Sequence, residues 1–348
     1  MSTSIVERGP ATTPETTSAT TPVQRPVRKP IDRPVILGTG QLGLAIMDEF
    51  AARGMPVTLV NRRGAVAESL PSQVTLLQAD LTDPAAVRRV CAGADAVFYC
   101  AQPAYTEWPA QFPPLVDAAV AGLAGRGIRF IFGDNLYLYG STHGAPIHED
   151  LPSAAIGPKG RTRGQLVETL FAAHKTGALP VTMGRASDFY GPRVTDSVVG
   201  DLVFAAALAG KTVNLLGNID LPHSYTYIRD FARALIVLGE HPAAYGQAWH
   251  VPNAPTLTTR QFLDLLQAET GRPVKIRTAG PTMLNVLGLF NPLLREFKEL
   301  SYEFTAPYIV DDRKFRTVFD LDATPHRQAI AETLAWYRMR TADRAHRS

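Results

Sequence analysis

The sequence predicts an α/β fold of the Rossmann type, a doubly wound parallel sheet with a smaller C-terminal substrate-binding lobe. Short apolar runs that suit buried strands alternate with helical patterns through the first half of the chain, and this alternation is typical of a parallel sheet. A glycine-rich turn lies directly between the first apolar run and the first helical pattern. Strand, glycine turn and helix in this order form the opening unit of a nucleotide-binding sheet.

The opening unit spans residues 34–63. Residues 35–37 are an apolar run that predicts a buried strand. Residues 44–50 place large apolar side chains on one face of a helix, which we expect to end at Gly54 as a natural C-cap. A second strand is expected at 57–60. The unit therefore has the strand, turn, helix and strand that a dinucleotide fingerprint requires.

The turn itself reads Gly-Thr-Gly-Gln-Leu-Gly. The first glycine of such a turn permits the tight bend, the second lets a pyrophosphate approach the backbone, and the third lets the helix pack closely on the strand. The start of the helix offers unpaired N–H groups and the positive end of its dipole to phosphates. We therefore predict that a dinucleotide binds Gly38, Thr39, Gly40, Gln41, Leu42 and Gly43.

The residues after the second strand indicate which dinucleotide is bound. An NAD site usually has an acidic residue here, which bonds the ribose 2′-hydroxyl. This chain has Asn61, Arg62 and Arg63 instead, and a guanidinium can form charge-assisted hydrogen bonds with a 2′-phosphate. We predict NADP(H) as the cofactor, bound by these three residues. The alternative is that the two arginines belong to a solvated edge.

Further strands and helices continue the alternation. We expect strands at 74–77, 96–100, 129–132 and 180–183, and helices from Pro84 onward, at 115–125 and at 164–174. The expected domains are an NADP-binding domain at 31–190, completed by later segments within 213–256, and a mainly substrate-binding lobe at 191–340. Residues 1–30 are rich in Thr, Pro, Ser and Ala and are expected to be a disordered tail, and 341–348 a second tail.

The composition limits the classes of function. The chain has 348 residues, of which 45% are hydrophobic and 19% charged, and its net charge is +3. Nucleic acid and anionic membranes are therefore not expected as partners. The spacing of Cys91 and Cys100 suits neither a disulfide framework nor a zinc site, so we expect a cytoplasmic protein without a metal. A small-molecule substrate is the expected partner, and the sequence leaves the oligomeric state open.

Two loops at expected strand ends add candidate residues for binding the cofactor. Ala101, Gln102 and Pro103 follow the fourth strand, at the edge where open α/β sheets bind ligands. Asp80 and Leu81 follow the third strand. The Asp80 carboxylate is placed to accept from an adenine amino group, or alternatively to cap the helix that begins near Pro84.

Several motifs together resemble the extended short-chain dehydrogenase/reductases of the epimerase/dehydratase-like branch. The resemblance extends over about 34–340 and rests on the glycine turn, Asp80-Leu81, Tyr139-Gly140, and the segments at 185–192, 223–234, 250–253, 257–261, 308–312 and 335–337. It implies that Lys159, Ala186, Ser187 and Phe189 also bind the cofactor. It further implies that the substrate contacts Gln102, Asn135, Asp188 and His223.

The chain departs from this family at the catalytic residues. The resemblance implies a Tyr-x-x-x-Lys pair that exchanges the proton of the substrate oxygen, plus a Ser or Thr that positions it. None of the eleven tyrosines has a lysine four residues later. Asn135 occupies the Ser/Thr position, and the best alignment places Lys159 in the tyrosine position and Arg163 in the lysine position. Asn135, Tyr137 and Lys159 are the predicted catalytic residues.

Three sources of the missing proton remain open. Another side chain of the protein is one, with Tyr99, Tyr137, Tyr139, Asp188 and Lys159 as the candidates. The substrate is the second, because a ketone beside a phenol already has an internal hydrogen bond and needs little beyond orientation. The third possibility is that the protein binds NADP and catalyses nothing.

We favour the second source, which predicts an aromatic polyketide-like substrate. The apolar stretch 283–294, with Phe297, Tyr302, Phe304 and Tyr308, suits a wall for a large flat compound. The complete pattern resembles an atypical, tyrosine-less angucyclinone ketoreductase, which implies NADPH-dependent reduction of a ring carbonyl in antibiotic biosynthesis. The alternatives are a nucleotide-sugar epimerase or dehydratase, and a non-catalytic NADP-binding regulatory protein.

Overall fold

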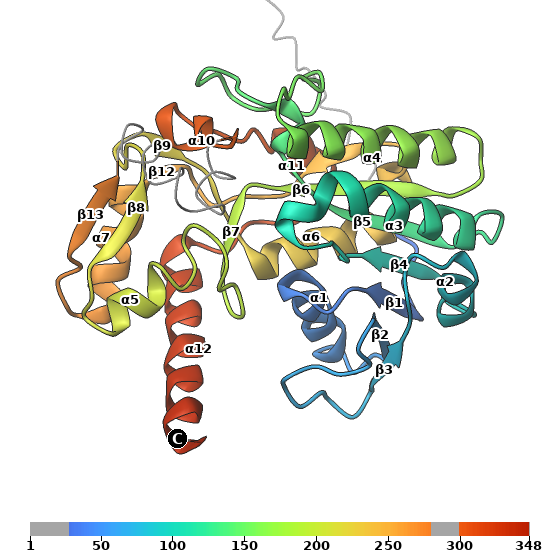
Figure 1. Cartoon of the computed structure of the whole chain (residues 1–348), viewed down its shortest axis with the longest axis horizontal. Coiled ribbons are helices and arrows are strands. Elements are labelled where there is room, and N and C mark those ends of the chain that lie inside the picture. The colour runs from blue at the N-terminus through green and yellow to red at the C-terminus, as the bar shows by residue number, and fades with distance from the viewer. Residues whose placement is uncertain (1–27, 280–298, 348) are drawn as a thin grey trace, which may run out of the picture.

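A parallel sheet of seven strands forms the centre of the computed structural model, which describes residues 28–279 and 299–347 (Figure 1). Its strand order is β11-β6-β5-β4-β1-β2-β3, so the order reverses between β1 and β4. That reversal opens a crevice at the carboxyl ends of the strands. The strands are β1 (Pro34–Leu37), β2 (Val57–Asn61), β3 (Val74–Gln78), β4 (Ala96–Tyr99), β5 (Arg129–Asn135), β6 (Val181–Ala186) and β11 (Ala248–His250). The predicted doubly wound Rossmann-type fold is confirmed.

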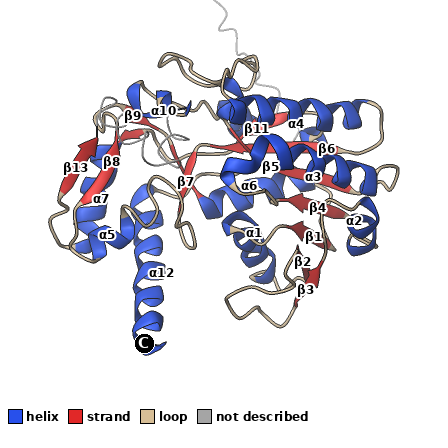
Figure 2. Cartoon of the chain, in the orientation of Figure 1, coloured by secondary structure: helices blue, strands red, loops and turns tan. Residues whose placement is uncertain are grey.

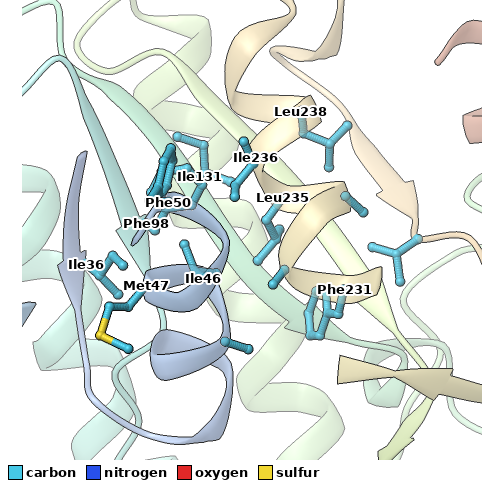
Figure 3. Close-up of a cluster of buried hydrophobic side chains, with 14 of the residues drawn as sticks. Ile36, Ile46, Met47, Phe50, Phe98, Ile131, Phe231, Leu235, Ile236 and Leu238 are labelled. Atoms are coloured by element: carbon cyan, nitrogen blue, oxygen red, sulfur yellow. The ribbon is translucent and has the colours of Figure 1, made fainter. Parts of the chain in front are cut away.

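Helices cover both faces of this sheet (Figure 2). Because successive side chains of a strand point to opposite faces, Ile36 packs in one apolar layer while Val35 and Leu37 pack in the other. The first layer lies under α1 (Gln41–Ala51) and α6 (Ile228–Glu240), and the second lies under α2 (Pro84–Val90), α3 (Trp108–Leu123) and α4 (Pro158–Lys175). Figure 3 shows the first layer, to which α1 contributes Ile46, Met47 and Phe50 and α6 contributes Phe231 and Leu235.

A smaller lobe lies beside the sheet, on the left of Figure 1. Its aromatic core stacks Tyr190 on Phe204 and Phe204 on Tyr337, with Phe262 set edge-on to both Tyr190 and Phe204. The helices of this part are α5 (Phe204–Leu208), α7 (Thr259–Thr270), α10 (Tyr302–Thr305) and α12 (His326–Arg347), whereas α11 (Arg313–Val318) packs against β11 of the large sheet. Short strand pairs accompany them, formed by β7 (Asp188–Tyr190), β8 (Val213–Leu216), β9 (Pro222–His223), β10 (Tyr225–Tyr227), β12 (Leu257–Thr258) and β13 (Ile276–Ala279).

Two helices begin earlier than the sequence predicts. α3 begins at Trp108 rather than at Leu115 and continues through Pro113 and Pro114. Proline inside a helix removes a backbone hydrogen bond. Here the buried face of the helix, which includes Phe112 and Val116, packs against the sheet and stabilises the helix despite that loss. α4 begins at Pro158 rather than at Gly164, because proline suits the first helical position.

Four boundaries also differ from the expectation. Asp83, not Asp80, caps α2 and accepts from the backbone N–H of Ala85 at 2.9 Å. α1 ends at Ala51, and Gly54 lies in the following turn with φ +69°. Residues 28–30 of the expected tail contact the sheet, since the Arg129 guanidinium donates to the carbonyl oxygens of Lys29 and Pro30. At the other end, α12 extends through the expected second tail to Arg347.

Within the described residues, no helix combines the length and the apolar character needed to cross a bilayer.

Candidate active site

The glycine turn between β1 and α1 is shaped by contacts of its backbone. Gly38 has φ +109°, and a Cβ there would lie 2.5 Å from the backbone nitrogen of Ala101. A Cβ on Gly43 would lie 2.0 Å from the carbonyl oxygen of Gly38. Only glycine fits at either position, because the first needs a left-handed conformation and both lack space for a methyl group.

Gly40 differs from these two glycines, since a Cβ there would meet no atom of residues 28–279 and 299–347 within 4 Å. Gly40 is the N-cap of α1, and no side chain caps that helix. The first N–H groups of α1 are therefore directed to open space at the crevice, where they suit a phosphate. The geometry of this turn fits the pyrophosphate of a dinucleotide.

The residues after β2 divide into one structural residue and two exposed cations. The Asn61 amide donates to the Thr39 hydroxyl at 2.8 Å and to the carbonyl oxygen of Ala65, and its oxygen accepts from the N–H groups of Arg63 and Gly64. Asn61 thus fixes the turn. Arg62 and Arg63 are exposed beside it.

The remaining predicted cofactor residues around the sheet lie at or just beyond the carboxyl ends of strands. Asp80 is exposed after β3 and accepts from the N–H and hydroxyl of Thr82, which lower the pKa of its carboxyl. Leu81 is buried. Ser187 follows β6 and is bonded within the protein, since its hydroxyl donates to the carbonyl oxygen of Ser224 at 2.6 Å. Ala101, Gln102 and Pro103 follow β4, Ala186 is the last residue of β6, and Phe189 lies in β7.

Lys159 and Arg163 lie one turn apart at the start of α4, a helix that contains no tyrosine. Lys159 is 2% exposed, its ammonium lies 3.6 Å from the Glu299 carboxylate, and it stands over the Tyr105 ring. The same carboxylate accepts from the backbone N–H of Lys159 at 2.8 Å. Gly157 leaves room for it, because a Cβ there would clash with Glu299. Glu299 therefore caps α4 across 140 residues.

Arg163 belongs to a buried ionic network behind the crevice. Asp134 of β5 accepts from Arg163 at 3.2 Å and from Arg185 at 3.0 Å. Arg185 in turn donates to the Tyr139 hydroxyl, which lies 2.9 Å from Nε2 of His250. Arg163 also stacks on the rings of Trp108 and Phe112. These contacts with Asp134, Trp108 and Phe112 fix the Arg163 guanidinium in place. It is therefore less mobile than an unpaired lysine side chain would be.

Among the candidate proton donors, Tyr99 lies outside the candidate site. Its ring is 1% exposed and packs between Phe130 and Phe132 in the apolar layer under α3. Burial raises the pKa of its hydroxyl well above the usual range. Tyr139 is engaged by Arg185 and His250, and burial raises the pKa of Tyr139 to about 12.

Asn135 and Tyr137 lie together at the carboxyl end of β5. The Asn135 oxygen accepts from the backbone N–H of Tyr137 at 3.1 Å. The Tyr137 hydroxyl lies 3.5 Å from that of Tyr105, which follows β4, and the Lys159 ammonium is 4.6 Å from the centre of the Tyr105 ring. Tyr105, Tyr137 and Lys159 thus form one cluster. Burial is the main cause of the raised pKa of both phenols.

Asp188 and His223 form a second cluster in the lobe. Nε2 of His223 lies 3.0 Å from the Asp188 carboxylate, and Nδ1 lies 3.2 Å from the carbonyl oxygen of Glu303. The Glu303 carbonyl oxygen can only accept, so Nδ1 must carry a hydrogen. The second bond then needs a hydrogen either on Nε2 or on the Asp188 carboxyl. His223 is 3% exposed and stacks on Tyr225 and Phe304.

Three residues of the candidate site were not predicted from the sequence, namely Tyr105, Glu299 and Glu303. Tyr105 follows the Gln102-Pro103 loop by two residues, so its distance from the end of β4 could have indicated it. Glu299 and Glu303 lie more than 130 residues after α4 begins, and no local pattern links them to the site. The predicted apolar wall at 283–294 and Phe297 lie outside the described residues.

The match of the sequence to a family model shows which family the chain belongs to. Residues 35–251 match the NAD dependent epimerase/dehydratase family. The chain belongs to this family. A curated member, the UDP-N-acetyl-alpha-D-glucosaminuronate decarboxylase of Bacillus cytotoxicus, is 24% identical over 221 residues, which cover 57% of this chain and 68% of that protein.

Solved structures of the epimerase/dehydratase family share the fold. An epimerase from Methanothermobacter thermautotrophicus has a TM-score of 0.74 at 13% identity and covers 90% of this chain and 94% of its own. The UDP-glucose 4-epimerase of Thermus thermophilus, solved with NAD, has a TM-score of 0.70 at 18% identity and covers 88% of this chain and 99% of its own. At these identities the comparison shows a common fold.

Proposed function

We propose that this protein uses a nicotinamide dinucleotide, NADPH in preference to NADH, to reduce a carbonyl of an aromatic polyketide-like compound that supplies its own proton. The narrower form of the proposal is an angucyclinone-type ketone in antibiotic biosynthesis. Membership of the epimerase/dehydratase family and the geometry of the glycine turn support the dinucleotide. The exposed Arg62 and Arg63 support the choice of NADPH.

The start of α4 carries the proposal. In place of a phenol that could donate to a substrate oxygen, this helix presents Lys159 paired with Glu299 and Arg163 paired with Asp134. The two nearby phenols, Tyr105 and Tyr137, are poor acids because burial raises the pKa of each. A substrate with an adjacent acid does not need a strong acid from the protein.

The chemistry then balances without a protein acid. A bound reduced nicotinamide supplies the hydride that forms the new C–H bond at the carbonyl carbon. A phenol beside the carbonyl transfers its proton to the oxygen, which leaves an alcohol and a phenolate. A phenol has a pKa of about 10, so the resulting phenolate is far less basic than an alkoxide. We assign Asn135, Tyr137 and Tyr105 to orienting this substrate at the carboxyl ends of β4 and β5.

Two model ketones test this proposal. We expect 8-hydroxy-1-tetralone, whose phenol is hydrogen-bonded to its carbonyl, to be reduced at least about tenfold more efficiently (kcat/KM) than 8-methoxy-1-tetralone, which lacks that proton. NADPH consumption and analysis of the alcohol product measure both reactions. Equal rates for the two ketones would show that the protein supplies the proton.

A second candidate function is the conversion of a nucleotide sugar, and the comparisons support it better than they support a polyketide. The curated relative is named as a decarboxylase of a UDP-sugar acid, and the Thermus thermophilus structure is named as a UDP-glucose epimerase with NAD. This chemistry requires a group that takes a proton from a sugar alcohol. Tyr137, Lys159 and Asp188 are the predicted residues available for that role.

Incubation with NAD and UDP-glucose, UDP-glucuronate or dTDP-glucose distinguishes the two functions. NMR detects whether a new sugar nucleotide forms. Its formation, without reduction of either tetralone, would establish the second function. Binding of NADPH without turnover of any of these compounds would instead support the non-catalytic role considered from the sequence.

A further inference from the structure

Glu303 of α10 is a buried acid that the proposed function does not use. Its side chain is 2% exposed, and its Oε1 atom has no hydrogen-bond partner within the described part of the chain. No lysine or arginine of the described residues forms an ion pair with it. An unpartnered buried carboxyl oxygen is costly for a fold, which suggests that a ligand completes its bonding.

The surroundings of Glu303 favour its neutral form. Burial raises the pKa of its carboxyl well above the usual range, and the negative charge of Asp188 raises it further. A hydrogen bond from the Tyr308 hydroxyl acts in the opposite direction and lowers the pKa of the carboxyl, but burial is the larger effect. With one oxygen accepting from Tyr308, a neutral carboxyl has its own O–H free to donate to a ligand.

Aromatic rings border this carboxyl. Tyr302 and Tyr308 have ring centres 6.5 Å apart, and the Tyr308 ring lies 5.2 Å from that of His223. Glu303 is also close enough to Tyr105 and Tyr137 for its charge to raise the pKa of both phenols. Glu303 is therefore within electrostatic range of both phenols.

We propose that Glu303 donates a hydrogen bond from a neutral carboxyl to an oxygen of a flat aromatic ligand, which lies among Tyr302, Tyr308 and Tyr137. This inference rests on the proposed function and adds a residue that recognises the substrate. A donor that carries no charge stabilises a ligand carbonyl, and it stabilises the phenolate formed after reduction more strongly. The aromatic walls supply flat apolar area for the rings of the ligand.

Binding of 1-tetralone in the presence of NADP⁺ tests the inference without requiring turnover. Glu303→Leu removes the donor, and we expect it to weaken binding about tenfold. Glu303→Gln keeps a neutral donor of the same shape, and we expect its affinity to stay within about threefold of wild type. Glu269→Gln, a carboxylate on α7 of the same lobe paired with Arg327, is the matched control and should bind as wild type does.

The pH dependence provides a second readout. 1-Tetralone has no titratable group, so its wild-type affinity should fall as pH rises and Glu303 loses its proton, whereas Glu303→Gln should show no such fall. The groups that face Glu303 and are common to both proteins are Asp188, His223, Tyr105, Tyr137, Tyr302 and Tyr308. A fall of equal size in both proteins would assign it to these neighbours and overturn the role of Glu303.

Other outcomes are equally decisive. Loss of 1-tetralone binding in Glu303→Gln to the same degree as in Glu303→Leu would overturn the neutral donor. Unchanged binding in Glu303→Leu, or no binding by the wild type, would overturn the site. Dependence of UDP-glucose but not 1-tetralone binding on Glu303 would overturn the aromatic ligand class. NADPH affinity equal to wild type verifies that each variant is folded. Glu303-dependent binding without ketone reduction would refute the proposed function alone.

Discussion

At the scale of single residues, the proposed preference for NADPH over NADH rests on Arg62 and Arg63. Both are exposed after β2, while the side chain of Asn61 is fully engaged with the turn. A ligand can therefore meet the two guanidinium groups without breaking any contact of Asn61. Under the proposed function, selection of NADPH depends on the charge of these two side chains.

Replacing Arg62 and Arg63 together with alanine should weaken NADPH by at least about tenfold, because charge-assisted bonds to the 2′-phosphate are lost. The affinity for NADH should change by less than about twofold. Fluorescence titration of both nucleotides measures the difference. Arg88→Ala with Arg89→Ala, an exposed pair on α2, is the control. Equal losses for NADPH and NADH would contradict the assignment of NADPH.

The sequence could reveal Arg62 and Arg63 because they follow a strand that its apolar pattern defines. It could not reveal Glu303, since nothing near Glu303 in the sequence indicates burial beside Asp188. The structural role of Arg163 could not be predicted from the sequence either. Its position four residues after Lys159 suggested a substitute for a catalytic lysine, whereas its contacts with Asp134, Trp108 and Phe112 hold it in a buried network.

At the scale of elements, the glycine turn provides a matched pair of variants. Gly40→Ala places a methyl group in open space, whereas Gly43→Ala places one against the Gly38 carbonyl oxygen. The first variant should keep the wild-type Tm within about 1 °C and bind NADPH at least tenfold more weakly, since the methyl group blocks the pyrophosphate. The second should lose about 1–3 kcal/mol of stability.

Thermal unfolding and nucleotide titration of both variants measure these effects. A Gly40→Ala protein that binds NADPH as tightly as wild type would show that the phosphates lie elsewhere. Loss of stability in Gly40→Ala equal to that in Gly43→Ala would show that the turn is tightly packed at both positions.

Apolar patterns predicted which elements exist, but not where each begins. The six strands expected before residue 190 are present, because their apolar runs pack against the layers on the two faces of the sheet, although the run of the edge strand β3 is only half-buried. The predicted starts of α3 and α4 were too late. Burial of Trp108 and Phe112, and the Glu299 carboxylate at the start of α4, are tertiary effects that a local pattern does not contain.

For the whole molecule, the buried His250 makes stability depend on pH. Burial lowers the pKa of His250 to about 3. In the unfolded chain the ring has its ordinary pKa of about 6.5, so the unfolded state binds more protons between these values. Stability should therefore fall as pH decreases from about 6.5 toward about 3.

Chemical denaturation at several pH values measures this dependence in wild type and in His250→Gln. The glutamine variant should be less stable than wild type at neutral pH, because it alters the contact with Tyr139, but it should lose less stability on acidification. Parallel losses in the two proteins would show that groups other than His250 control the acid response.

The cap of α4 has a consequence for how the protein is made. Residues 157–160 leave the ribosome long before Glu299, whose carboxylate binds the first N–H groups of the helix and the Lys159 ammonium. Contacts between residues so distant in the chain form late in folding. During translation, the cap on the first turn of α4 can therefore form only after the C-terminal part of the chain has been made. We expect this part of the candidate active site to be completed late.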